Sequence, residues 1–132
     1  MNLFELTFIL VLLAIHFVAD FMLQPQAVAI KKSHSILALL THVRSYTFST
    51  GIMLLIYVWL VPSLRSQLTL ISIFQYVVLV GLSHCLVDMF TSKVSKYFYN
   101  KNDLHNFFVI IGLDQFLHQA TIILFYYITI QQ

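Results

Sequence analysis

Four apolar stretches of helix length run through the chain and constrain its fold more than any other feature. A transmembrane helix needs about 20 mainly apolar residues, and proline, found here at Pro25 and Pro62, ends a helix. The predicted spans are approximately residues 3–23, 36–60, 68–90 and 107–130. The sequence therefore predicts an all-α fold, a four-transmembrane-helix bundle that forms a single integral membrane domain over residues 1–132.

The composition agrees with a membrane protein. The chain is 60% hydrophobic and only 9% charged, whereas a soluble domain averages about 25% charged residues. A formal net charge of +2 without a basic run excludes nucleic acid as a partner. Residues 1–6 carry no Lys or Arg, so we expect the first apolar segment to be a retained span rather than a cleaved signal peptide.

Basic residues are distributed unevenly between the two ends of the predicted bundle. Arg65 alone lies between spans two and three. Six lie at the opposite end, in or beside the loops that follow spans one and three: Lys31, Lys32, Arg44, Lys93, Lys96 and Lys101. Because cytoplasmic loops carry the excess of Lys and Arg, this end is predicted to be cytoplasmic, and both termini to lie outside.

Seven ionisable side chains fall inside the spans near that same end. They are His16, Asp20, His42, His84, Asp88, Asp114 and His118. At a rise of 1.5 Å per residue, His16, His42, His84 and Asp114 are each expected about 9 to 11 Å deep. Three His/Asp pairs are spaced i,i+4 and so share a helix face. Because such groups are costly in hydrocarbon, their convergence indicates a functional site.

The residue types favour a metal site. Histidine and carboxylate together suit Zn²⁺, Mn²⁺ or Fe²⁺, and the seven candidate ligands are enough for one or two ions, an arrangement common in phosphoester hydrolysis. Asp20, Asp88 and Asp114 are also the candidates for a catalytic base. Four further residues are candidates for binding substrate or a water molecule beside the ion: Gln24, Ser92, Gln115 and Arg44. Arg44 is the weakest of these, because it lies about 200° around the helix from His42.

Other interpretations of the cluster stay open. It could be a hydrogen-bonded network that holds the helices of a small membrane subunit in register, or a path for cations or protons. Four histidines in a bundle can also bind haem, although a neighbouring Asp suits an apolar macrocycle poorly. The chain contains no H-E-x-x-H motif, which excludes a standard zincin, and the lone Cys85 favours packing over chemistry.

The segment His16-Phe-Val-Ala-Asp20-Phe-Met resembles His84-Cys-Leu-Val-Asp88-Met-Phe. Each is followed by a basic loop and by a span that carries a histidine. Two repeated helical hairpins would explain this pattern, and chance similarity of seven residues is the alternative.

The motifs H-x-x-x-D-x-x-x-Q (His16 to Gln24), the lone His42, S-H-x-x-x-D (Ser83 to Asp88) and D-Q-x-x-H (Asp114 to His118) cover all four spans. In these motifs the chain resembles domain of unknown function 3307, a family of small bacterial membrane proteins. The run from His84 to Lys93 is also similar to the H-x-x-x-D-x-x-T run of membrane-bound metal-dependent hydrolases. These resemblances imply a bacterial inner-membrane protein and a hydrolase role, without naming a substrate.

Together these inferences predict a metal-dependent membrane hydrolase that acts on a lipid-linked or membrane-proximal ester or phosphoester at the cytoplasmic leaflet. The expected cofactor is one or two divalent ions (Zn, Mn or Fe). The expected partners are membrane lipids, with a homo-oligomer or a larger membrane complex as a further possibility.

Overall fold

The computed structural model describes residues 2–131, and every regular element in this range is helical, which confirms the predicted all-α fold. The elements are α1 (Leu3–Phe17), the π-helical turn η1 (Val18–Met22), α2 (Gln26–Lys31), α3 (Ile36–Leu60), α4 (Pro62–Gln67), α5 (Leu70–Asn100) and α6 (Leu104–Thr129). Four helical segments, of which the first joins α1 to η1, are long and apolar enough to cross a membrane. This is consistent with a membrane protein.

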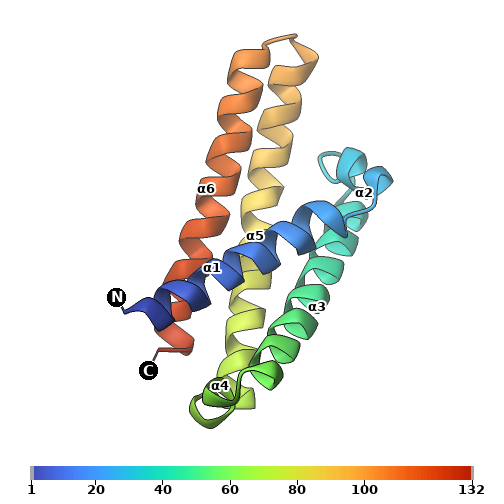
Figure 1. Ribbon diagram of the computed structural model, residues 1–132. Helices are drawn as coiled ribbons and strands as arrows, with labels where there is room; N and C mark the ends of the chain where they lie inside the picture. The colour runs from blue at the N-terminus through green and yellow to red at the C-terminus, as the bar shows by residue number, and fades with distance from the viewer. Residues whose placement is uncertain (1, 132) are drawn as a thin grey trace.

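The long helices form an open bundle around the α5–α6 hairpin (Figure 1). α5 and α6 run antiparallel side by side, α3 packs on α5, and α1 crosses the bundle obliquely. The side-chain amide of Gln131 donates to the Glu5 carboxylate at 2.9 Å, so both ends of the described chain lie at one end of the bundle. An even number of spans requires this arrangement. Large apolar side chains such as Ile71 and Phe48, each 70% exposed, face outward as lipid contact would require.

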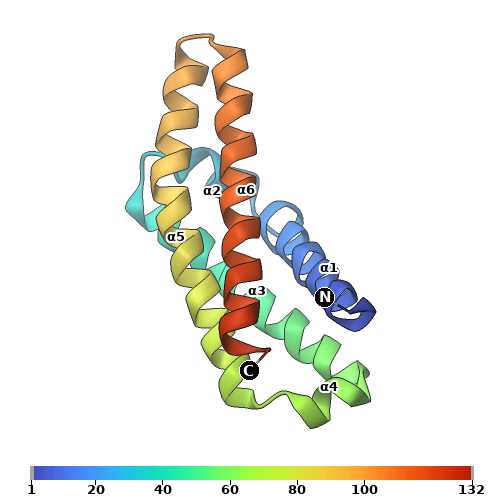
Figure 2. The same ribbon diagram turned by 90° about the vertical axis from the view of Figure 1, so that its left-hand side faces the viewer.

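Helix α5 continues ten residues past the predicted end of the third span, to Asn100. Lys93 and Lys96, which the sequence analysis placed in a loop, therefore lie on the helix. The prediction ended the span where hydropathy falls, but a helix can continue beyond the apolar region when nothing breaks it, and residues 91–100 contain neither Gly nor Pro. The extended hairpin passes well beyond α2 in both views (Figure 2).

A three-residue turn joins α5 to α6. Asn102 adopts a left-handed conformation (φ 57°), which Asn tolerates better than most residues. Its N–H donates to the carbonyl of Tyr99, and the N–H of Asp103 donates to the carbonyl of Phe98, the pattern of a Schellman motif. Asp103 then caps α6 by accepting from the backbone and side chain of Asn106, and these hydrogen bonds lower the pKa of its carboxyl group.

The first span ends in one π-helical turn rather than in regular α-helix. The N–H of Leu23 donates to the carbonyl of Val18 at 3.0 Å, a five-residue spacing, and the helix stops before Pro25 as predicted. Such π-helical turns are rare in proteins overall, and those that occur often lie at functional sites. Here the turn carries Asp20, a residue that is 4% exposed.

Two short helices, α2 and α4, occupy connections that the sequence analysis treated as loops. Pro25 precedes α2, and Pro62 stands in the first turn of α4, where its missing N–H costs nothing. The two predicted hairpins also differ in geometry, because α5 and α6 lie side by side whereas α1 and α3 diverge from the α2 end (Figure 1). The suggested duplication thus gains no support from their arrangement.

Candidate metal centre

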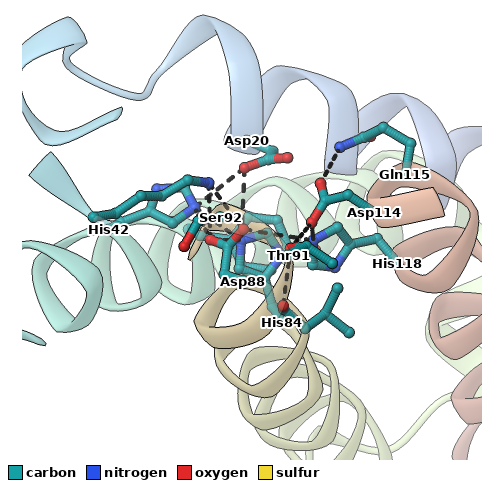
Figure 3. A network of polar contacts seen from close by, with 12 residues as sticks. Asp20, His42, His84, Asp88, Thr91, Ser92, Asp114, Gln115 and His118 are labelled. Atoms are coloured by element: carbon teal, nitrogen blue, oxygen red, sulfur yellow. Dashed lines mark hydrogen bonds and ion pairs between the residues drawn. The ribbon is translucent and has the colours of Figure 1, made fainter. Parts of the chain in front are cut away.

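The seven predicted polar residues meet between the long helices, and Figure 3 labels all of them except His16. α1 and η1 supply His16 and Asp20, α3 supplies His42, α5 supplies His84 and Asp88, and α6 supplies Asp114 and His118. Six of the seven are at most 4% exposed, and Asp114 is partly exposed. The convergence inferred from alternating span directions is therefore present in the fold.

Two histidines and two aspartates form the tightest group. The Nε2 atoms of His42 and His84 lie 2.8 Å apart. Asp20 Oδ1 is 3.2 Å from the first and 3.6 Å from the second. Asp88 Oδ2 is 3.1 Å and 3.4 Å from the same two atoms. Four side chains from three helical elements (η1, α3 and α5) thus direct one atom each toward a common point.

These distances are close to those between the ligands of a small divalent ion. Zn²⁺ binds imidazole nitrogen and carboxylate oxygen at roughly 2.0 to 2.2 Å, so the ligand atoms of a tetrahedral site lie about 3.3 to 3.6 Å apart. Of the five distances, those from His84 to Asp20 (3.6 Å) and Asp88 (3.4 Å) fall in this range, and the other three are shorter, at 2.8 to 3.2 Å. Asp20, His42 and His84 could accordingly hold a metal ion, and Asp88 stands where a fourth ligand would be.

A second group shares two of these residues. His84, Asp88 and His118 could also hold an ion. The other oxygen of Asp88, Oδ1, lies 3.9 Å from Nε2 of His118, which is itself 3.5 Å from Asp114 Oδ1. The two oxygens of Asp88 therefore face different histidines, Oδ2 toward His42 and His84 and Oδ1 toward His118, so Asp88 could be a ligand in either group.

His16, also predicted as a ligand, lies beside these groups. Its Nδ1 is 3.0 Å from the hydroxyl of Tyr46, and its Nε2 is 3.4 Å from the side-chain oxygen of Gln115. Its nearest carboxylate oxygen, Oδ2 of Asp20, is 3.9 Å from Nε2. Both ring nitrogens of His16 therefore have partners other than an ion.

Lys32 enters the site from the connection between α2 and α3. Its ammonium nitrogen lies 2.9 Å from both oxygens of Asp88, and its side chain is only 17% exposed. The sequence analysis treated Lys32 as one of several orienting surface lysines. No pattern in the sequence distinguishes it from exposed Lys31, because the distinction depends on how the connection folds over the bundle.

A cavity of about 430 Å³ opens beside the cluster. Asp20, Asp88 and Asp114 line it, whereas none of the four clustered histidines does. An ion held between these aspartates and histidines would therefore have the imidazole rings on one side and the cavity on the other. Catalytic metal sites need such an open position for water or substrate.

The predicted auxiliary residues separate into two sets. Gln24, Ser92 and Gln115 line the cavity, and Gln115 donates to Asp114 at 3.0 Å. The side-chain nitrogen of Gln24 and the hydroxyl of Ser92 are buried and have no hydrogen-bond partner among the described residues. Arg44 is exposed and does not line the cavity, in agreement with its angular position on the helix.

Two more residues of the site were missed from the sequence. Tyr46 bonds His16 and stacks on the ring of His84 at 3.8 Å between centroids. Thr91 donates its hydroxyl to Asp114. Tyr46 is four residues after His42 and Thr91 is three after Asp88, so the same helical spacing that linked the His/Asp pairs could have identified both.

A family model described as "Protein of unknown function (DUF3307)" matches residues 8–132, which include every residue of the site. No curated protein and no solved structure matches the chain.

Proposed function

The chain belongs to the DUF3307 family, whose function is unknown, and we propose that it is a metal-dependent hydrolase of a lipid-linked or membrane-proximal ester or phosphoester. The observation that carries the proposal is the two-sided arrangement of the cluster. Imidazoles that could hold an ion lie behind carboxylates that line a cavity of about 430 Å³. A site that served only to tie helices together would not need open space in front of its carboxylates.

The chemistry divides between an ion and Asp114. A divalent ion (Zn, Mn or Fe) held by His42, His84, Asp20 and Asp88 would acidify a bound water and polarise the scissile group. Asp114 stands outside this group and lines the cavity, so it is placed to take a proton from water as the oxygen attacks phosphorus or carbonyl carbon. The P–O or C–O bond then breaks, and the proton passes to the leaving oxygen.

The setting fits a substrate delivered from the membrane. The four candidate spans and the basic residues around the cavity support a bacterial inner-membrane protein whose site opens toward the cytoplasmic leaflet. The partners proposed with it are membrane lipids, and a second copy or a larger membrane complex.

The proposal predicts that Asp114→Asn slows turnover while the protein keeps its ion. Loss of a general base typically costs 10² to 10⁴-fold in rate, so we expect about a 100-fold decrease or more. The measurement is release of phosphate, headgroup or fatty acid from a panel of membrane lipids, with metal content determined on the same preparations by elemental mass spectrometry.

Asp103→Asn is the matched control, because Asp103 is the N-cap residue of α6 and does not line the cavity. It should keep wild-type turnover. If metal-loaded wild type hydrolyses no lipid of the panel, or if chelated protein hydrolyses them equally well, the hydrolase proposal is wrong.

The ion pair between Lys32 and Asp88 favours one alternative, a polar network that stabilises a small membrane subunit without an ion. In such a network the lysine would supply the positive charge that the carboxylates require. Wild-type protein that is purified without chelator, carries no metal and takes up none from added Zn²⁺, Mn²⁺ or Fe²⁺ would establish this alternative.

Lys32 should compete with the ion for Asp88, because its ammonium contacts both carboxylate oxygens at 2.9 Å. Replacing it by Gln removes a charged hydrogen bond to this group, which is worth about 1.5 to 3 kcal/mol. We therefore expect Lys32→Gln to bind metal roughly tenfold more tightly, and to be less stable than wild type when metal-free. Lys31→Gln, at an exposed neighbour, is the control. Equal metal affinities in the two variants would contradict the competition.

A further inference from the structure

The cavity beside the cluster is lined by both polar and apolar side chains. Besides the three aspartates of the site, the polar residues of its lining include Lys32, Ser33, Ser92, Ser95, Lys96 and Asn100. The apolar residues of its lining include Phe21, Ala29, Ile30, Phe107, Ile110 and Ile111. A small soluble anion would use only the polar residues, and a hydrocarbon only the apolar ones. The lining therefore suits a molecule that has a polar head and an apolar chain.

Two lysines line the cavity together with the three aspartates of the site. Lys96 lines it from α5, and its ammonium group donates to Nε2 of His34 rather than to a carboxylate. Lys32 lines it next to Asp88. If an ion neutralised Asp88, the ammonium group of Lys32 would no longer be needed for that, and Lys32 and Lys96 could both bind an anion in the cavity. Lysine binds phosphate as a compact point charge with three donors.

Ser92 supplies an uncharged donor between them. Its side chain is on the cavity wall, the residue is 9% exposed, and its hydroxyl has no hydrogen-bond partner among the described residues. A buried hydroxyl without a partner is costly, so it is expected to bond a ligand or a water molecule in the cavity. Ser92 lies on α5 between Asp88 and Lys96, and a ligand oxygen bound there would lie beside both the cluster and the ammonium group.

We infer that the cavity binds the phosphate headgroup of an anionic glycerolipid, with Lys96, Lys32 and Ser92 on the phosphate and the start of an acyl chain against the wall of Phe107, Ile110 and Ile111. The inference rests on the proposed function insofar as it names the substrate class: a phospholipid whose phosphate lies next to the ion. A cavity of about 430 Å³ holds a headgroup and the beginning of a chain, and the rest of the lipid remains in the bilayer.

The test is native mass spectrometry of detergent-solubilised protein titrated with dioctanoyl phosphatidate, which reports the intact bound lipid and bound metal in the same spectrum. Parallel titrations use dioctanoylglycerol, which lacks the phosphate, and inorganic phosphate, which lacks the chains. Lys96→Gln is compared with Lys93→Gln, an exposed lysine of the same helix that does not line the cavity.

We expect phosphatidate to bind wild type and the Lys93 variant equally, and the Lys96 variant at least about tenfold more weakly, since one charged hydrogen bond corresponds to about a tenfold change. Equal effects of the two substitutions, or dioctanoylglycerol binding as tightly as phosphatidate, would overturn the inference. Inorganic phosphate binding as tightly as phosphatidate would instead identify a free phosphate site. Lipid binding by a protein that takes up no metal would contradict the hydrolase proposal and leave the lipid site in place.

Discussion

Replacing His84 by alanine is expected to abolish the metal binding proposed for this site. His84 belongs to both groups that could hold a metal, and its Nε2 lies 2.8 Å from the ring of His42 and within 3.6 Å of Asp20 and Asp88. Loss of a residue that only orients a ligand costs 10 to 100-fold in metal affinity, so loss of a ligand shared by two groups should cost at least about 100-fold. Metal content by elemental mass spectrometry and a competition titration with a chromogenic chelator measure the effect.

His105→Ala provides the matched control, because His105 is exposed at the beginning of α6 and lies outside both groups. It should keep the wild-type metal content. Helix content and thermal unfolding in the same detergent show whether the His84 variant is folded. A folded His84 variant that retains wild-type affinity for the ion would rule out both groups as the metal site.

The second large effect is expected at Gly81 of α5, which lies against Thr47 of α3. A Cβ on residue 81 would overlap the hydroxyl of Thr47 and would lie 3.1 Å from its Cγ2 and 3.3 Å from its Cβ. Rotation of the threonine side chain cannot relieve all three contacts, so the helices must separate. We expect Gly81→Ala to lower the free energy of unfolding by about 1 to 3 kcal/mol, the usual range for overpacking.

Thermal unfolding followed by circular dichroism in detergent measures this loss. Gly112→Ala is the control, because a Cβ at residue 112 meets no atom within 4 Å. It should leave stability unchanged or raise it, since Ala is the better helix former. The double variant Gly81→Ala, Thr47→Ala should recover most of the loss. If it does not recover, the close approach to Thr47 is not the cause of the loss.

These two effects are linked through α5. His84 is one helical turn beyond Gly81, so a separation of α3 from α5 would also move His42 away from His84. The Gly81 variant should therefore bind metal more weakly than wild type although it changes no ligand. Close helix packing at Gly81 and the short distance between the two imidazoles are parts of the same contact between α3 and α5.

Much of the architecture follows from one-dimensional properties of the chain. Hydropathy locates four helices because each must present an apolar surface over its whole length, and Pro25 marks the end of the first. The meeting of His16, His42, His84 and Asp114 follows from alternating span directions alone. Helical spacing then selects the faces that turn inward, which is why the buried His and Asp residues could be identified from the sequence.

Only the tertiary structure separated candidate ligands from neighbouring residues within that set. Helix spacing places His16 at the same level as His42. Because α1 crosses the bundle obliquely, however, the ring nitrogens of His16 contact Tyr46 and Gln115. Lys32 lies in a short connection without periodicity, and its contact with Asp88 arises from the path between α2 and α3. Likewise, the sequence cannot show that the carboxylates face a cavity and the histidines do not. Local sequence determines which faces are polar, whereas distances between atoms on different helices depend on crossing angles, which are set by packing over the whole bundle.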